Sequence, residues 1–227
     1  MSTPPLIAGL YPYVRDGKYH SPYVTLREIP QSLKVNPWYR DELVVLAGDK
    51  DSACQLEEFG LDVHRVFDDA PASVQHDMAH KMKHWMCMWA AREFGEFLWV
   101  DWDTISLRRP DQRLWEWCRF SKTPKFIRIP GYWATVNCGV YYGNADWADA
   151  MEQSFGYEVS EPSDELLWTA VLPSDVRRRP VYWWNNLVVH VQNHDQLCWI
   201  DESVYFIHTA DLGWADAARK RCSYQST

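Results

Sequence analysis

Short apolar runs alternate with segments of helical periodicity along most of the chain. Apolar runs of this length predict strands buried in a sheet; they lie at 6–11, 43–48, 61–67, 97–100, 135–142 and 203–208. Apolar residues that recur every three or four positions predict helices; these lie at 51–59, 73–94, 145–155 and 162–171. Strands alternating with helices predict an α/β fold whose central sheet is mixed, mostly parallel and flanked by helices.

The helix at 73–94 has the clearest pattern. Its large apolar residues fall on one face: Met78, Met82, Trp85, Met86 and Trp89. Gly95 follows and is expected to end the helix, because glycine adopts the left-handed backbone conformation at low cost. The apolar strand at 97–100 should therefore follow the helix at once.

Three histidines on this helix have the spacing of a helical zinc site. His76, His80 and His84 recur every four residues. On a helical wheel they lie opposite the large apolar residues, so we interpret them as a solvated face. Lys81 and Lys83 flank the apolar face, and Lys81 is close enough to its edge to reach a ligand.

Two aspartates close the apolar run at 97–100. Asp101 and Asp103 are separated by Trp102, and residues i and i+2 of an extended chain point to the same side. Ligands of α/β folds bind at the carboxyl ends of the strands, where this pair is expected to lie. Carboxylate oxygens there suit a hard divalent cation such as Mg²⁺ or Mn²⁺.

A second pair of aspartates has the same D-x-D pattern. Asp49 and Asp51 also follow a predicted strand, but Gly48 interrupts the apolar run before them. Asp51 is expected to cap the amino end of the helix at 51–59. We therefore interpret this pair as structural and the pair at 101 and 103 as metal-binding.

Composition narrows the class of protein. The 227 residues are 47% apolar and no Gly/Ser/Pro-rich linker divides them, so one domain spanning 1–227 is expected. The net charge of −8 argues against bulk binding of nucleic acid. Six cysteines without C-x-x-C spacing suggest a reducing compartment. No signal-peptide pattern and no run of membrane-spanning length is present, so a cytoplasmic location is expected.

Four motifs in this order resemble the GT-A-fold glycosyltransferases, and most closely their glycogenin-like retaining class. The motifs are Lys81-x-x-x-Trp85 before the Asp101-Trp102-Asp103 strand, Asn137-Cys138-Gly139-Val140-Tyr141, Asp164-Glu165 and Phe206-Ile207-His208. The resemblance covers roughly 76–215. It implies a nucleotide-binding half at 1–105 and a half at 106–227 that binds sugar and acceptor.

The resemblance also implies the roles of individual residues. Mn²⁺ or Mg²⁺ would be held by Asp101, Asp103 and His208. The nucleotide-sugar donor, a UDP-sugar in the family, would be contacted by Tyr11, Lys81, Asp101 and Gly139. Catalytic roles fall to Asp164, Glu165 and Asn137. Gly213 and Lys220 stand several residues away from the places where the family has a phosphate-binding glycine and lysine.

The stereochemistry and the acceptor stay open at this stage. The resemblance favours retention, although Asp164 and Glu165 also suit the general base of an inverting enzyme. The acceptor is a glycan, a protein side chain, a lipid-linked sugar or a modified nucleobase.

Three competing functions remain. A phosphohydrolase of the haloacid dehalogenase type shares the D-x-D strand, but its motif has Thr or Val where this chain has Ile105. A nucleotidyltransferase would need a glycine-rich basic loop after the first strand, which 8–11 does not supply. A sugar-binding module without activity predicts that the ligand still binds after Asp101→Ala.

Overall fold

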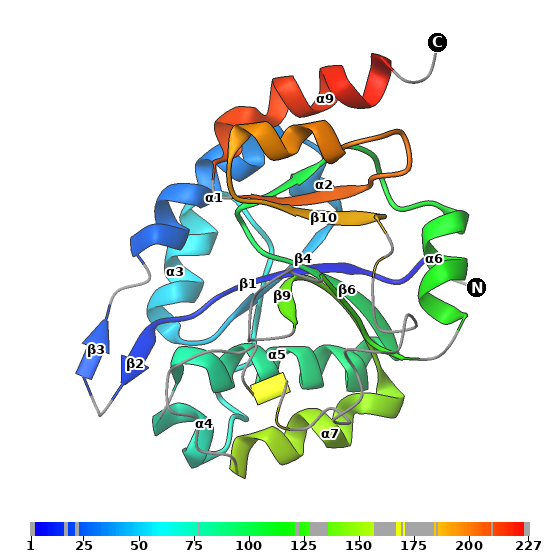
Figure 1. Cartoon of the computed structure of the whole chain (residues 1–227). Coiled ribbons are helices and arrows are strands. Elements are labelled where there is room, and N and C mark those ends of the chain that lie inside the picture. The colour runs from blue at the N-terminus through cyan, green and yellow to red at the C-terminus, as the bar shows by residue number, and fades with distance from the viewer. Residues whose placement is uncertain are drawn as a thin grey trace.

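The computed structural model describes residues 3–15, 18–20, 23–76, 78–120, 123–127, 136–156, 167–168, 170, 184, 186–209 and 211–224. In these ranges six strands form a central sheet in the order β5-β4-β1-β6-β9-β8 (Figure 1). Their bounds are β1 Leu6–Leu10, β4 Leu43–Ala47, β5 Val63–Arg65, β6 Glu96–Val100, β8 Lys125–Ile127 and β9 Asn137–Asn144. β5, β4, β1 and β6 pair in parallel, whereas β9 is antiparallel to both β6 and β8. The predicted mixed, mostly parallel sheet is therefore confirmed.

Helices cover both faces of this sheet. Helices α4 Ala72–His76, α5 Met78–Phe94 and α7 Ala148–Gln153 lie on one face, and helices α1 Tyr23–Val35, α3 Lys50–Glu58 and α6 Gln112–Arg119 lie on the other (Figure 1). In β6, Phe97 and Trp99 pack into the core beneath α5, while Leu98 and Val100 pack into the opposite core. Burial on both faces explains why this strand reads as an uninterrupted apolar run.

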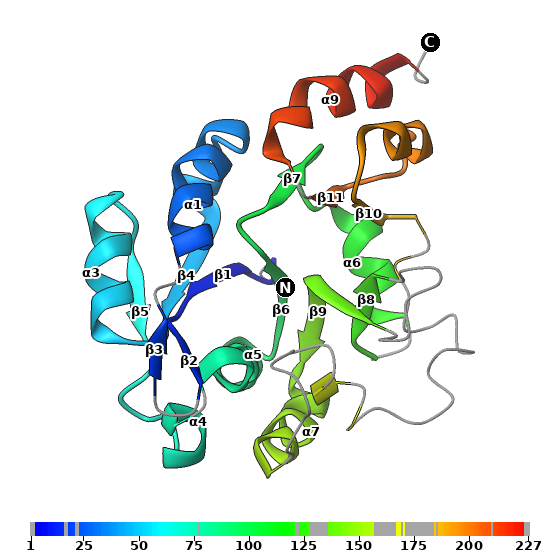
Figure 2. The ribbon, with the colours of Figure 1, turned by 60° about the vertical axis from the view of Figure 1, so that its left-hand side comes forward.

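A smaller sheet lies beside the central one, below helix α9 Ala215–Tyr224 (Figure 2). Its strand order is β10-β11-β7, with bounds Val188–Val191, Phe206–Thr209 and Thr104–Ser106. A third apolar core lies between this sheet, α9 and the 3-10 segments η5 His194–Trp199 and η6 Leu212–Trp214. Because β7 begins just after β6 ends, the D-x-D residues connect the two sheets.

The remaining described elements are short. Helix α2 spans Tyr39–Glu42, the hairpin strands β2 and β3 span Tyr13–Arg15 and Lys18–His20, and η1 Ala145–Trp147 and η2 Ser154–Gly156 flank α7. Among the described helices, none combines the length and the apolar character needed to cross a membrane.

Most predicted elements are confirmed, with shifted bounds. The predicted strands at 6–11, 43–48 and 97–100 match β1, β4 and β6 closely, and Gly95 has the expected positive φ of 78°. The strand expected at 61–67 is only three residues long. The helix expected at 162–171 lies mostly outside the described residues. α1, α6, β10 and α9 were not predicted.

Two sequence interpretations are corrected. Asp49, not Asp51, caps α3, since its side chain accepts a hydrogen bond of 2.7 Å from the Ser52 amide; a structural role is thus shown for Asp49. The expected solvated histidine face is wrong at His84, which is buried and lies 2.9 Å from the Ser154 hydroxyl through Nδ1. α5 is covered by α7 as well as by the sheet, so its second face is also buried.

One buried amide attaches α1 to β7. Asn36 follows α1 and is fully buried. Its Nδ2 donates to the Thr104 carbonyl over 2.8 Å, and its Oδ1 accepts from the Ser106 amide over 2.8 Å. The side chain thus bonds to the β7 backbone as a neighbouring strand would, one residue beyond the D-x-D.

Asn36→Ala is expected to lower the free energy of unfolding by about 3 kcal/mol, because two buried backbone groups lose their partners. Gln31→Ala, at an exposed position of α1, serves as the matched control and should change stability by less than about 0.5 kcal/mol. Urea denaturation measures both. Equal stability of the two variants would show that β7 does not depend on this amide.

Candidate metal-binding site

The D-x-D residues form a tight turn between the two sheets. The Thr104 amide bonds back to the Asp101 carbonyl over 3.1 Å. The Asp101 amide donates to the Gly139 carbonyl on β9 over 2.7 Å, and the Asp103 carbonyl accepts from the Thr209 amide on β11 over 3.1 Å. Each aspartate backbone is therefore fixed to a strand from the second half of the chain.

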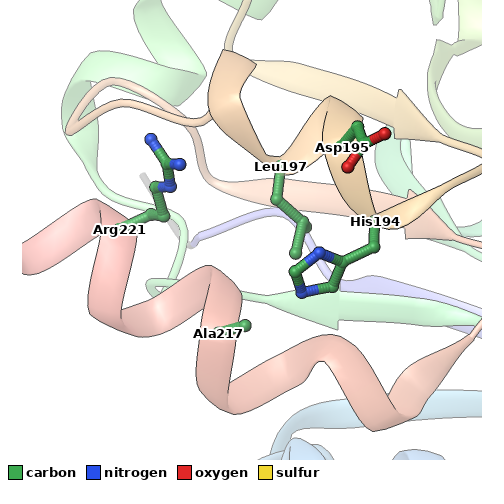
Figure 3. Close-up of a pocket in the computed structure, with 5 residues that line it drawn as sticks. All are labelled: His194, Asp195, Leu197, Ala217 and Arg221. Carbon is green, nitrogen blue, oxygen red and sulfur yellow. The ribbon is translucent and has the colours of Figure 1, made fainter.

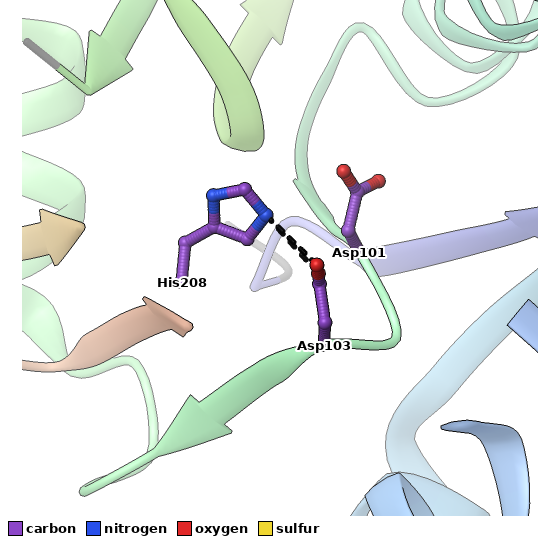
Figure 4. Close-up of side chains that lie close together, drawn as sticks. All are labelled: Asp101, Asp103 and His208. Carbon is purple, nitrogen blue, oxygen red and sulfur yellow. Dashed lines mark hydrogen bonds and ion pairs between the residues drawn. The ribbon is translucent and has the colours of Figure 1, made fainter. Parts of the chain in front are cut away.

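His208 lies directly beside Asp103. β11 pairs antiparallel with β7 so that His208 stands opposite Thr104. Its Nε2 lies 3.1 Å from Oδ1 and 3.2 Å from Oδ2 of Asp103 (Figure 4). One ligand atom from each of Asp101, Asp103 and His208 can be chosen so that all lie within 4.8 Å of one another. The expected meeting of these three side chains, from positions more than a hundred residues apart, is observed.

The Asp103–His208 pair perturbs the pKa values of both groups. Burial opposes protonation of His208, but the charge of Asp103 and the hydrogen bond to it outweigh burial and raise the His208 pKa. Burial likewise opposes ionisation of Asp103, yet His208 and then Lys83 hold its pKa below the usual range. Each group therefore favours the charged form of the other.

Asp101 is held on the other side by α5 and β6. Its Oδ1 accepts a hydrogen bond of 2.6 Å from Trp99 Nε1, and its Oδ2 lies 3.0 Å from Lys83 Nζ. The side chain of Lys83 is only 6% exposed. Lys81, which the sequence favoured, is also buried on α5, but the lysine observed on Asp101 is Lys83. The predicted contact of Lys81 with the donor stays a prediction.

A further carboxylate faces the site from α1. Glu28 is half-buried, and its pKa is raised to about 7 by burial and then by the charges of Asp103 and Asp101. Sequence reasoning missed Glu28 because it predicted no helix over 23–35. The accumulation of negative charge at one place is what a divalent cation would relieve.

Gly139 provides the space that His208 occupies. A Cβ added to Gly139 would lie 2.5 Å from three atoms of the His208 ring. Asn137, two residues earlier, is buried and its Oδ1 accepts a hydrogen bond of 3.1 Å from the Gly139 amide. The structure thus gives a reason for the glycine, contact with His208, that differs from the expected approach of a sugar.

His190 is a second histidine that sequence reasoning did not single out. It lies on β10 in parallel register with His208, and their Nδ1 atoms are 3.0 Å apart. Burial, followed by the charge of His208, lowers the pKa of His190 to about 4. His190 lies in a valine-rich strand, and the local sequence pattern gives no sign of a functional histidine.

The three side chains fit a divalent metal chemically. Two carboxylates and one imidazole suit Mn²⁺ at least as well as Mg²⁺. Both oxygens of Asp103 lie within 3.2 Å of His208 Nε2, Oδ2 in a hydrogen bond and the buried Oδ1 in an ion pair. A cation bound between Asp103 and His208 would take the place of the proton that the two groups now share.

The other expected site residues lie apart from the metal-ligand cluster or outside the described residues. Asp164 and Glu165 lie outside the described residues. Tyr11 is half-buried and follows β1 at the carboxyl end of the strands. A Cβ added to Gly48 would lie 2.5 Å from the Cβ of Tyr11. Gly213 is in η6 and Lys220 is exposed on α9.

A separate pocket lies between η5 and α9 (Figure 3). Its volume is about 350 Å³, and it is lined by His194, Asp195, Leu197, Ala217 and Arg221. It contains none of the three clustered ligands and a single carboxylate, so it does not reproduce the chemistry of the D-x-D site.

No protein-family model and no curated protein sequence matches this chain. Among solved structures, a glycosyltransferase involved in glycosylation of the major capsid of PBCV-1 is similar with a TM-score of 0.51 and 12% identity, over 96% of this chain and 100% of that one. Mouse xyloside xylosyltransferase 1 gives 0.49 and 12%, over 90% and 97%. The glycosyltransferase GlyE of Streptococcus pneumoniae gives 0.45 and 15%, over 75% of this chain and 43% of GlyE.

The similarity to the PBCV-1 protein concerns the fold. At 12% identity it leaves the reaction to be inferred from the site, and the two similarities with TM-scores below 0.5 add no weight. The chain has the expected GT-A-type fold, a mixed and mostly parallel sheet flanked by helices, like that glycosyltransferase.

Proposed function

We propose that this protein is a metal-dependent glycosyltransferase that moves a sugar from a nucleotide-sugar, a UDP-sugar, to an acceptor with retention of configuration. The observation that carries the proposal is the cluster of Asp101, Asp103 and His208 at the carboxyl end of β6. In α/β folds this is the edge of the sheet where ligands bind. The UDP donor and retention rest on the resemblance to the glycogenin-like class.

The charges around the cluster suit a diphosphate leaving group. A Mn²⁺ or Mg²⁺ ion held by the three side chains would neutralise the diphosphate as it departs. Lys83 lies against Asp101 and brings an ammonium group to the same place. Lys81 remains a proposed phosphate contact. Tyr11 at the end of β1 is proposed to stack on the base, and Gly139 to lie near the sugar.

The transfer itself breaks the bond between the anomeric carbon and the diphosphate oxygen, whose electron pair stays with the nucleotide. An acceptor hydroxyl forms the new bond to that carbon on the face from which the diphosphate departs, which retains the configuration, and its proton passes to the departing diphosphate oxygen. Asp164 and Glu165 are proposed to lie near the anomeric carbon, with Asn137 orienting the sugar. Asn137 is fixed against the Gly139 amide, so its position is determined by β9.

Incubation with Mn²⁺ and a panel of nucleotide-sugars should release free nucleotide and sugar slowly from one donor. Asp103→Asn is expected to reduce that rate about 100-fold, because it removes an anionic ligand worth several kcal/mol of charge stabilisation. Asp51→Asn, at the exposed position of the other D-x-D pair, should leave the rate unchanged. Chromatography of the nucleotide products measures all three.

Two results would contradict the proposal. Cleavage of simple phosphate esters without donor preference would indicate a phosphohydrolase. Binding of a nucleotide-sugar that is equal with and without Mn²⁺ and survives Asp101→Ala, with no turnover, would indicate a binding module.

Gly139→Ala is expected to weaken Mn²⁺ binding about 10-fold or more, since the new methyl group forces the His208 ring from its position. Isothermal titration calorimetry measures the affinity. Gly156→Ala is the control: a Cβ there meets nothing within 4 Å, and Mn²⁺ binding should not change. Unchanged affinity in Gly139→Ala would mean that His208 does not bind the metal in the observed position.

A further inference from the structure

The contact between His190 and His208 has a defined donor and acceptor once a metal is considered. The two rings lie 4.9 Å apart between centroids, with Nδ1 facing Nδ1 at 3.0 Å. A hydrogen bond between two such nitrogens requires that one carries a proton and the other does not. The opposite nitrogen of His208, Nε2, faces Asp103. Protonation of one ring is therefore tied to that of the other.

Metal binding through Nε2 determines which nitrogen of His208 carries the proton. For Nε2 of His208 to bind a metal it must present a lone pair, so the single proton of the neutral ring is on Nδ1. That proton points at His190 Nδ1, which must then be the acceptor.

His190 is otherwise an unfavourable residue at this place. With Nδ1 as acceptor, its proton is on Nε2, which is buried without a hydrogen-bond partner in the described part of the chain. The other three positions of β10 are valines. A buried polar atom left without a partner costs stability and calls for an explanation. Acceptance of the His208 proton is the interaction that offsets it.

We propose that His190 is a positioning residue that accepts the Nδ1 proton of His208 and thereby holds the His208 ring with Nε2 directed at the metal. The proposal rests on the metal-binding function proposed above. Gly139 restricts the ring from one side by contact. Contact alone does not distinguish the ring from its flipped form, in which a carbon replaces Nε2. The hydrogen bond to His190 does distinguish them.

The test compares Mn²⁺ affinity across variants of one site, without any donor sugar. His190→Leu removes the acceptor and keeps an apolar side chain of similar size. Mn²⁺ affinity measured by calorimetry should fall about 10- to 100-fold, the usual effect of losing a partner of a ligating histidine. His190→Asn places an oxygen acceptor near the former Nδ1 and should recover most of the affinity. His64→Leu, at an exposed strand histidine, is the control and should bind Mn²⁺ normally.

Two further measurements separate positioning from structural support. Thermal denaturation should show little change in stability for His190→Leu, because the variant removes the unsatisfied Nε2–H of His190 but leaves the Nδ1–H of His208 without its acceptor. The ¹⁴N coupling in the electron spin echo spectrum of bound Mn²⁺ reports imidazole coordination. It should be present in the original chain and in His190→Asn, and weakened in His190→Leu. If His190→Leu does not fold, His190→Val, which matches the neighbouring residues, replaces it.

His208→Ala distinguishes a failure of the proposed metal site from a failure of the positioning role proposed for His190. If it leaves Mn²⁺ affinity and the ¹⁴N coupling unchanged, the metal site itself is wrong. If it abolishes the coupling while His190→Leu retains full coupling and affinity, the metal site stands and the positioning role of His190 is overturned. A loss of affinity in His190→Leu that is matched by a loss of stability and not recovered by His190→Asn would also overturn it.

Discussion

The three-residue turn from Asp101 to Asp103 has its main chain fixed at both ends, and the site depends on this constraint. Asp101 is bonded through its amide to Gly139, and Asp103 through its carbonyl to Thr209. These bonds bring β9 and β11 to either side of one turn. As a result, the backbone hydrogen bonds that join the two sheets also place His208 beside the carboxylates. This is preorganisation in its simplest form, because the ordering is done by folding rather than by the ligand.

Charge is distributed unevenly around that turn. Glu28 from α1 adds to the negative potential, and Lys83 from α5 opposes it at Asp101. Burial first, and then the charges of Asp103 and Asp101, raise the pKa of Glu28 to about 7. A cation entering the site would be attracted by the same field. Stability and ligand binding therefore place opposite demands on these residues, as is common where charged groups gather.

The sequence was most informative where burial is complete. β1, β4 and β6 are buried on both faces, and their uninterrupted apolar runs located them almost to the residue. The meeting of Asp101, Asp103 and His208 was also foreseen, because a family resemblance supplied the long-range pairing that local patterns do not contain. Local patterns failed on α5, since a helix buried on two sides has no solvated face to read. Glu28 and His190 were missed because their importance arises only from tertiary neighbours.

Gly9, near the end of β1, connects the packing of the core to the candidate metal-binding site. A Cβ at Gly9 would lie 2.6 Å from the Trp99 ring, and the indole of Trp99 donates to Asp101. The carbonyl of Gly9 also accepts from Trp102 Nε1 over 2.9 Å. Both tryptophans of the D-x-D strand are thus set by one residue near the start of the chain. Substitutions at positions 9 and 99 are therefore expected to be coupled during evolution. A larger residue at position 9 would displace the Trp99 ring and with it the hydrogen bond that Trp99 donates to Asp101.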